Sequence, residues 1–544
     1  MRRVLRLWRT VRHLRPVQVY GRLWFRLARP RPDLSQALPL RPCDGDWCAP
    51  ARRQPSLTGP GAFRFLDEAG SLAEHGWDDP ARPKLWRYNQ HYFDDLNALN
   101  APERDDWHRA LIADWIAANP PGRGTGWEPY PTSIRIVNWV KWGLADTAPS
   151  QDAIQSLAVQ ARWLTRRMEW HLLGNHLFAN AKALVFAGLY FNGAEAARWL
   201  DTGTRILARE IPEQILPDGG QFERSPMYHA LAVEDMLDLV NIARAFGRND
   251  LAQARSVRVA SMLDWLGAMT HPDGDIAFFN DAAIGIAPDQ KQLFDYAGRL
   301  GFAAPSDRGA LCHLAASGYA RLSAGPAVLI ADLARIGPDY LPGHAHADTL
   351  SFELSLHGQR VFVNSGTSVY GLGPERLRQR GTAAHSTLMI DGQDSSEVWS
   401  GFRVGRRARP YDVNVRRDGV ALVAEGAHDG YRHLRGAPVH RRRWQLEENG
   451  LAVTDAVEGS GCHQIEMRFH LAPGLQAVMS SDGAIKVKDE QGRSVLDLEI
   501  TGGVAEVAPS SWHPQFGMTL PSQVICIHAT ADLPTSLQTN LHWT

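Results

Sequence analysis

The chain has 544 residues, which is too many for one hydrophobic core, so more than one domain is expected. Its formal net charge is −1, which excludes a protein tuned as a whole for nucleic acid. The cysteines are odd in number and scattered, which argues against a disulfide framework: Cys43, Cys48, Cys312, Cys462 and Cys526. We therefore expect reduced thiols and a cytoplasmic location.

The first 40 residues are strongly basic, with ten arginines and one acidic residue, Asp33. Leu5, Trp8, Val11 and Leu14 fall near helical spacing. Arginines interrupt every apolar run, so a classical signal peptide is not expected, and no run in the chain is long enough to span a membrane. We expect residues 1–45 to form a basic helical arm. It either packs on its own protein or contacts a membrane or an anionic polymer.

The apolar periodicity is helical up to about residue 310. Residues 106–119, 150–170 and 225–247 show spacings of three and four. Ser150 and Ser225 stand at expected N-caps, Pro226 follows at a first helical position, and Gly247 ends the last of these segments. The sequence predicts an all-α domain over residues 46–310.

After residue 310 the apolar period becomes two. Alternation is clear in residues 349–356 and 464–471, and turn residues separate shorter runs of the same kind. These runs cover residues 451–457, 485–489, 496–502 and 523–529. A series of helices followed by a series of short strands predicts two domains, with an antiparallel β domain over residues 311–544.

Twelve of the 18 tryptophans precede residue 171. Most of them are expected to fill spaces between packed helices. Aromatic faces beside polar tips also suit sugar rings, because the rings stack and the tips bind hydroxyl or carboxylate groups. The candidates for substrate binding are Trp127, Tyr130, Arg135 and Asn138.

Two sets of polar residues in the helical half are candidates for a catalytic role. Asn175 and His176 follow a glycine in an apolar helical run, where they either form a satisfied buried pair or face a ligand. Tyr228 lies in the first turn of the helix that begins at Pro226. The positive helix N-terminus and nearby Arg224 would favour its phenolate, although an ordinary half-buried tyrosine fits the same pattern.

The segment "LPGHAHADTLSFEL" places His344 and His346 two residues apart before an expected strand. Such a pair could share a metal, transfer protons or face water. Asn364 and His385 come from nearby segments that also read as extended, so His346, Asn364 and His385 form a candidate metal-ligand set.

These motifs together resemble the heparinase II/III family of polysaccharide lyases. The matching segments are "GNH", "DGGQFERSPMYH", "HPDGD", "FFND", "GHAHAD", "VFVNSGTSVY" and "RGTAAHSTLMIDGQDSSEVW", in that order, over about residues 80–410. The resemblance implies an (α/α) toroid followed by an antiparallel β-sandwich, and an enzyme that cleaves uronic-acid polysaccharides by β-elimination. Such an enzyme has to neutralise the uronate carboxylate, remove the C5 proton and protonate the departing oxygen.

The resemblance also implies roles for individual residues. Asn175 and His176 resemble the carboxylate-neutralising group, Tyr228 the base, acid or both, and His344 a histidine on the opposite side of the cleft. Arg224 is our own candidate for holding a substrate acid group. His346, Asn364 and His385 resemble a zinc triad, but an aspartate is expected at position 364, so the asparagine implies weaker metal binding.

Two other functions fit the same sequence. A glycoside hydrolase on the same toroid would need two carboxylates, for which Asp218, Glu223 and Glu128 are available. A non-catalytic glycan-binding protein of exopolysaccharide assembly would fit the basic arm and Asn364. The partner expected in all three cases is an acidic polysaccharide or oligosaccharide.

Overall fold

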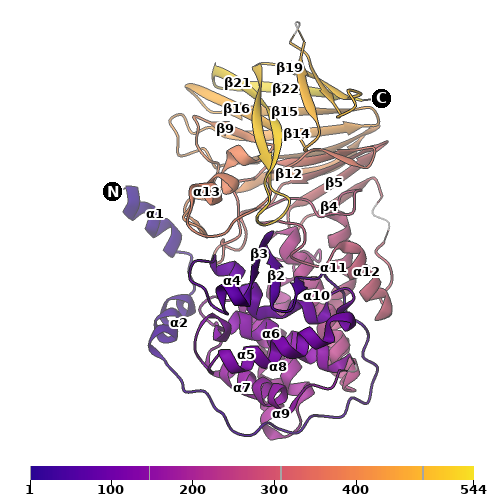
Figure 1. The fold of residues 1–544 in the computed structure, drawn as a ribbon. Coiled ribbons are helices and arrows are strands. Elements are labelled where there is room, and N and C mark those ends of the chain that lie inside the picture. Colours follow the sequence, from indigo (N-terminus) through magenta and orange to yellow (C-terminus); the bar gives the residue numbers. More distant parts are fainter. Residues whose placement is uncertain (1, 146, 307–308, 481–482, 544) are drawn as a thin grey trace.

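The computed structural model describes residues 2–145, 147–306, 309–480 and 483–543. A helical half and a sheet-rich half lie one above the other, in chain order (Figure 1). The helices of the first half are α1 (Arg2–Val11), α2 (Pro16–Leu27), α3 (Leu72–His75), α4 (Lys84–Tyr92), α5 (Asp105–Ala118), α6 (Pro129–Leu144), α7 (Gln151–Arg166), α8 (Gly174–Tyr190), α9 (Ala194–Gln214), α10 (Pro226–Ala245), α11 (Asn249–Ala268) and α12 (Gln290–Arg299).

The helices form where the apolar spacing predicted them, and their caps explain where they begin. Ser150 accepts a hydrogen bond from the Ala153 N–H at the start of α7, and Ser225 accepts one from the Tyr228 N–H at the start of α10. Gly247 follows α10 with a φ of +67°, which suits glycine at a helix end. The tryptophans mainly fill the helical core, as expected, with Trp86, Trp115 and Trp139 fully buried.

Strands dominate after residue 310, and all of the pairings between them are antiparallel. A five-stranded sheet contains β4 (Leu311–Leu314), β5 (Tyr319–Ala324), β6 (Ala327–Asp332), β7 (Phe352–Leu356) and β8 (Gln359–Phe362). A four-stranded sheet has the order β20 (Val504–Trp512), β21 (Leu520–Asp532), β16 (Cys462–His470) and β9 (Leu388–Ile390).

The largest sheet has eight strands. Their order is β12 (Pro410–Asp418), β13 (Ala421–His428), β14 (Val439–Glu447), β15 (Gly450–Glu458), β22 (Thr535–His542), β19 (Ser494–Thr501), β18 (Ile485–Lys488) and β17 (Gln476–Met479). One apolar core joins all three large sheets, with Leu354, Ile525 and Val453 as members from each. Alternation at period two thus predicted the strands, and in β16 also the buried face, whereas both faces of β7 are buried.

Smaller elements complete the two halves. The helical half carries a three-stranded sheet of β1 (Leu57–Gly59), β2 (Ala62–Phe65) and β3 (Glu68–Ser71). The second half adds the helix α13 (Pro374–Arg380) and a hairpin of β10 (Val398–Trp399) and β11 (Arg403–Val404). The expected order, a helical domain and then an antiparallel sheet domain, is confirmed. Among the described residues, no helix is long and apolar enough to cross a membrane.

Candidate active site

Asn175 and His176 lie in the first turn of α8, where the chain changes direction after α7. Gly174 makes this turn possible, because its φ is +53° and a Cβ there would lie 2.3 Å from Leu341 of the second half. Both polar side chains are partly exposed. They begin the helix instead of lying inside it, and their partial exposure leaves both side chains accessible.

His176 is charged more readily than an isolated histidine. Its Nδ1 lies 3.2 Å from Glu169 Oε1. Burial lowers the pKa of His176, but attraction to the Glu169 carboxylate outweighs this, and the net shift is upward. The ring also packs against Tyr130, with centroids 4.6 Å apart. A partly exposed imidazole with a raised pKa, beside the Asn175 amide, can bind a carboxylate when it is protonated.

Tyr228 occupies the first turn of α10, as the sequence predicted. Its hydroxyl lies 3.0 Å from the Tyr370 hydroxyl. The sequence led us to expect an ionised Tyr228, but the structure contradicts this. Burial, with Tyr370 and Asp281 nearby, raises the pKa of Tyr228 well above its ordinary value. The cost of burying a phenolate exceeds the effect of the helix N-terminus. Tyr228 is therefore a neutral proton donor.

His344 comes from the loop between β6 and β7, and its ring is held by Asp281. Nδ1 lies 2.8 Å from Asp281 Oδ2, and 15% of the side chain is exposed. If Nδ1–H donates to the carboxylate, Nε2 is left as an unprotonated nitrogen that can accept a proton. Nε2 lies 3.8 Å from Glu223, a buried carboxylate.

The expected position of His344 across the cleft from Tyr228 is wrong. The two ring centroids are only 4.0 Å apart, so the rings are in contact and no sugar fits between them. The cause is Asp281, which draws His344 toward the helical half; the Asp281 N–H also donates to the His344 carbonyl at 2.9 Å. The two candidate catalytic groups therefore lie side by side, in contact with each other.

Asn175 and Tyr228 line one pocket in the helical half. Tyr130 and Asn138 line it as well, so these two of the four aromatic and polar candidates are in position. The pocket also contains three buried or half-buried cations, but each is paired with an acid: Arg53, Lys141 and Lys182 contact Glu234, Asp235 and Asp238. Asn175 lines this pocket, and the neighbouring His176 packs its ring on Tyr130.

Three other candidates lie away from the pocket. Trp127 and Arg135 are 3% and 0% exposed, and the Arg135 guanidinium stacks on Trp115 and hydrogen-bonds to Gln160 and the His91 carbonyl. Arg224 donates to the carbonyls of Ser317 and Arg335. Burial in the helical core keeps Trp127 and Arg135 from contacting a glycan, while Arg224 is partly exposed and its role stays a prediction.

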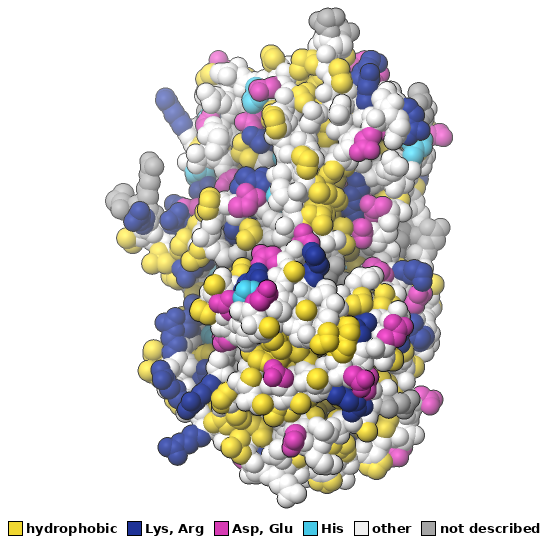
Figure 2. All heavy atoms as spheres, viewed as in Figure 1, with side chains coloured by type: hydrophobic (Ala, Val, Ile, Leu, Met, Phe, Trp, Pro, Cys, Tyr) yellow, Lys and Arg dark blue, Asp and Glu magenta, His cyan; other side chains and the backbone are white. Residues whose placement is uncertain are grey.

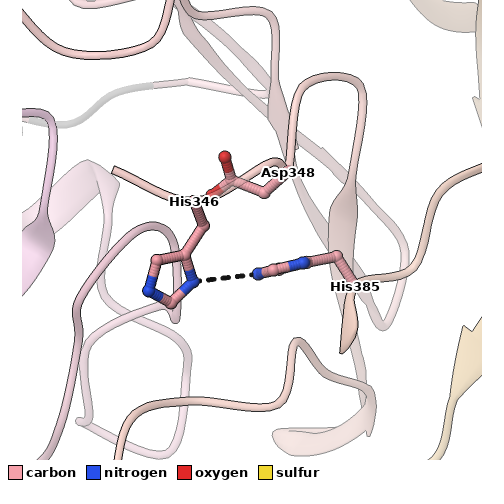
Figure 3. A group of neighbouring side chains, drawn as sticks. All are labelled: His346, Asp348 and His385. Atoms are coloured by element: carbon pink, nitrogen blue, oxygen red, sulfur yellow. Dashed lines mark hydrogen bonds between the residues drawn. The ribbon is translucent and has the colours of Figure 1, made fainter. Parts of the chain in front are cut away.

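His346 and His385 face each other within the sheet-rich half (Figure 3). His346 Nδ1 lies 3.1 Å from His385 Nε2, and the ligand atoms of His346, His385 and Asp348 all lie within 4.8 Å of one another. The outer nitrogens contact acceptors: His346 Nε2 lies 2.8 Å from Asp281 Oδ1, and His385 Nδ1 lies 2.8 Å from the Gly381 carbonyl. If the outer nitrogens carry the protons, the facing nitrogens, His346 Nδ1 and His385 Nε2, each keep a lone pair. A cation between these two nitrogens fits the donor set.

Asn364 is fully buried beside this group, but both ends of its amide are engaged. Oδ1 accepts from the Ser386 N–H at 3.0 Å, and Nδ2 donates to the Phe278 carbonyl at 3.0 Å. The acidic member near the two histidines is instead Asp348, which sequence reasoning missed. Its position two residues after His346 in "GHAHAD" was the available signal.

Asp281 connects the two halves of the site, and sequence reasoning missed it as well. This fully buried carboxylate contacts His344 with one oxygen, His346 with the other, and Arg376 with both. Burial opposes its ionisation, but Arg376 and the two histidines hold the pKa of Asp281 well below its usual range. Only the motif "FFND" marked this residue in the sequence.

Comparison with known proteins agrees with this arrangement. The model of the heparinase II/III N-terminus matches residues 90–297, and the model of the heparinase II/III-like C-terminal domain matches residues 307–544. The chain is 27% identical over 350 residues to a heparin-sulfate lyase of Bacteroides stercoris, covering 59% of this chain and 49% of that protein. It is 25% identical over 409 residues to a heparin-sulfate lyase of Bacteroides thetaiotaomicron, covering 64% and 55%. The matched parts thus span about half the length of these curated relatives.

Solved structures share the fold at low sequence identity. A crystal structure of heparinase III superposes with a TM-score of 0.65 and 18% identity, covering 86% of this chain and 76% of that one. A mutant of the heparan sulfate lyase HepC from Pedobacter heparinus gives a TM-score of 0.64 and 18% identity, covering 97% and 87%. These similarities extend across both halves of the chain.

Proposed function

We propose that this chain, which belongs to the heparinase II/III family, is a polysaccharide lyase that cleaves an acidic, uronate-containing glycosaminoglycan by β-elimination. The observation that carries the proposal is the contact between Tyr228 and His344. Asn175 lines the same pocket as Tyr228, and the His176 ring packs on Tyr130 of that pocket. A neutral phenol, an available imidazole nitrogen and a carboxylate-binding pair are the three groups that this reaction needs. The lyases among its relatives support the same class of substrate.

The proposed reaction begins with the uronate carboxylate bound by Asn175 and His176. Neutralising that carboxylate makes the C5 proton more acidic. His344 Nε2 then takes the C5 proton, and the electron pair forms the C4–C5 double bond. The C4–O bond breaks, and Tyr228 donates its hydroxyl proton to the departing oxygen. Asp281 stabilises the imidazolium that forms on His344.

We further propose that His346, His385 and Asp348 hold a zinc ion. Zinc prefers histidine nitrogen and carboxylate oxygen, and the outer nitrogens of both histidines already contact acceptors, as in protein zinc sites. The ion would supply a structural link between the β6–β7 loop and the segment that carries His385. Asn364 is left out of this set because its amide is engaged with backbone groups.

A glycoside hydrolase is less well supported. Glu128 contacts Lys84 and Tyr88, and Asp218 accepts from the Ser317 and Gly220 N–H groups. Of the three carboxylates considered, only Glu223 lies near His344. Hydrolysis needs two carboxylates on either side of the scissile bond, so this arrangement favours elimination.

Ultraviolet absorbance of the new conjugated double bond tests the proposed reaction. Purified protein would be incubated with glucuronate- and iduronate-containing polymers, sulfated and unsulfated, and with alginate-type uronates. A lyase gives the chromophore together with shorter chains. Shorter chains without the chromophore would mean a hydrolase, and saturable binding without any cleavage would mean a glycan-binding protein.

A further inference from the structure

The two N-terminal helices, α1 and α2, lie along one side of the molecule (Figure 1). In α2, Gln18 is buried and donates to the Tyr340 carbonyl, and the Phe25 ring packs on His171 with centroids 4.4 Å apart. The Arg167 guanidinium lies 3.6 Å from the centre of the Phe25 ring and donates to the Phe25 and Ala28 carbonyls. This inner face fixes α2 on the helical half.

The helix α1 is fixed to the sheet-rich half in the same way. Arg9 pairs with Glu397 at 3.2 Å, and the Trp399 indole donates to Thr10 Oγ1 at 3.1 Å. Arg6 lies over the Trp399 ring at 4.8 Å. Arg6, Arg9 and Thr10 of α1 thus face the protein.

The opposite faces of both helices are apolar and uncovered. In α2 the exposed side chains recur at helical spacing and are 61–71% exposed: Val19, Tyr20, Leu23, Trp24 and Leu27. In α1 they are 43–70% exposed: Val4, Leu5, Leu7, Trp8 and Val11. Figure 2 shows hydrophobic and basic side chains together along this side of the molecule. Apolar faces of this kind are unusual on a surface that contacts only water.

Arginines stand beside these apolar faces, and several have no acidic partner. Arg22, Arg26 and Arg29 are exposed and form no ion pair in the part of the chain that the structure describes. The whole segment up to residue 40 contains one acidic residue, Asp33. Its surface therefore combines positive charge with tryptophan, tyrosine and leucine.

We propose that the outer faces of α1 and α2 bind an anionic lipid surface, lying in the plane of the headgroups. Charge complementarity favours anionic over neutral lipids, because the arginines attract acidic headgroups. The apolar faces would enter the boundary between headgroups and acyl chains. Tryptophan and tyrosine prefer this interface. Helices of 10 and 12 residues are too short to cross a membrane, so the contact is peripheral. Because this surface is separate from the pocket, the inference does not depend on the proposed function.

Cosedimentation with vesicles tests the proposal on the full chain. The vesicles would contain phosphatidylcholine alone, or phosphatidylcholine and phosphatidylglycerol in equal parts. We expect binding to the anionic vesicles that decreases with added salt. Binding should weaken by about tenfold or more in Trp8→Glu/Trp24→Glu and in Arg22→Gln/Arg26→Gln. Val257→Glu and Arg435→Gln, at exposed positions elsewhere, should bind like the unmodified chain.

Circular dichroism melting of each variant verifies that it remains folded. Absence of binding to the anionic vesicles would overturn the proposal. Binding that survives Trp8→Glu/Trp24→Glu in the folded protein would also overturn it, because the apolar faces would then take no part. Retention on a soluble polyanion such as heparin, lost only in the arginine variant, would identify a polymer site in its place.

Discussion

The ring of Tyr228 lies against the ring of His344, with centroids 4.0 Å apart, and the Asp281 carboxylate holds the histidine in that position. If His344 is the base and Tyr228 the acid, as proposed, two groups that touch each other act on one face of a sugar. In a glucuronate the C5 hydrogen and the O4 oxygen lie on the same face, whereas in an iduronate they lie on opposite faces. The contact therefore has a direct consequence for the substrate.

The first prediction is a preference for glucuronate over iduronate. Cleavage of a glucuronate polymer should be at least about tenfold faster, which corresponds to about 1.4 kcal/mol in the barrier. Initial rates of absorbance increase on matched polymers measure this preference. Equal rates on both epimers, or faster cleavage of iduronate, would show that the base and the acid act from opposite sides in the bound state.

The second prediction separates the two tyrosines whose hydroxyls lie 3.0 Å apart. Tyr228→Phe removes the proton donor and should lower kcat by about 10²–10⁴ with little change in KM. Tyr370→Phe removes only a neighbour of that donor, so a smaller decrease in kcat is expected. Steady-state kinetics on the substrate found in the polymer panel measure both. A larger loss in Tyr370→Phe would reverse the assignment.

The third prediction concerns Asp281, the carboxylate shared by His344, His346 and Arg376. Asp281→Asn leaves the buried Arg376 guanidinium unpaired, so the free energy of unfolding should decrease by about 3–5 kcal/mol. The amide also cannot stabilise an imidazolium on His344, so turnover should be lost in the protein that remains folded. Urea unfolding and activity at low temperature measure the two effects.

A surface pair serves as the control for Asp281. Asp33 lies 3.3 Å from Arg166, and both side chains are about one-third or more exposed. Asp33→Asn should leave the urea midpoint of unfolding close to that of the unmodified chain, because an exposed ion pair contributes little to stability. If Asp281→Asn is equally mild, the carboxylate does not organise the site.

The order of the domains could be predicted from sequence because it depends on local periodicity. Spacings of three and four gave α7 and α10, and alternation gave β7 and β16, without any knowledge of distant contacts. Ser150 and Ser225 marked helix starts correctly, since a cap acts within its own turn. The domain limits at residues 45 and 310 stay a prediction.

The arrangement of the site depended on long-range contacts that the sequence does not show. Asp281 reaches His344 across 63 positions and Arg376 across 95. The sequence therefore pointed to His344, but placed it opposite Tyr228. Trp127 and Arg135 are residue types that often bind sugars, but both side chains are buried. Their burial follows from the packing of whole helices, which local sequence does not reveal. The sequence predicted Asn364 and not Asp348 as the third metal ligand, because the family resemblance implies a ligand at position 364.

The fourth prediction is a pH dependence that arises from His176 and Glu169. The pKa of His176 is raised in the folded chain, so its protonation stabilises the fold below pH of about 6.5, and the effect is lost as the pH rises through the folded value. His176→Asn should therefore reduce the free energy of unfolding, by less than about 1 kcal/mol, at acidic pH and not at alkaline pH.

Binding of an anionic oligosaccharide should follow the same titration. Affinity should decrease as His176 loses its proton; this step should disappear in His176→Asn and move to lower pH in Glu169→Gln, where the carboxylate that raises the pKa of His176 is gone. His528→Asn, at an exposed site with a side chain 47% accessible, should leave the profile unchanged. Isothermal titration calorimetry over a pH series measures the effect. A profile that is unaltered in His176→Asn would exclude this histidine from carboxylate binding.

The fifth prediction tests the metal site by its ligands. The chain purified with zinc should retain about one ion per molecule, measured by elemental analysis, and Asp348→Asn or His385→Ala should release it. Asn364→Ala should lose structural hydrogen bonds and stability but retain the ion, because its amide contacts Ser386 and Phe278. Zinc should raise the melting temperature of the unmodified chain and not that of His385→Ala. Release of the ion by Asn364→Ala with full retention in Asp348→Asn would instead assign the third ligand to position 364.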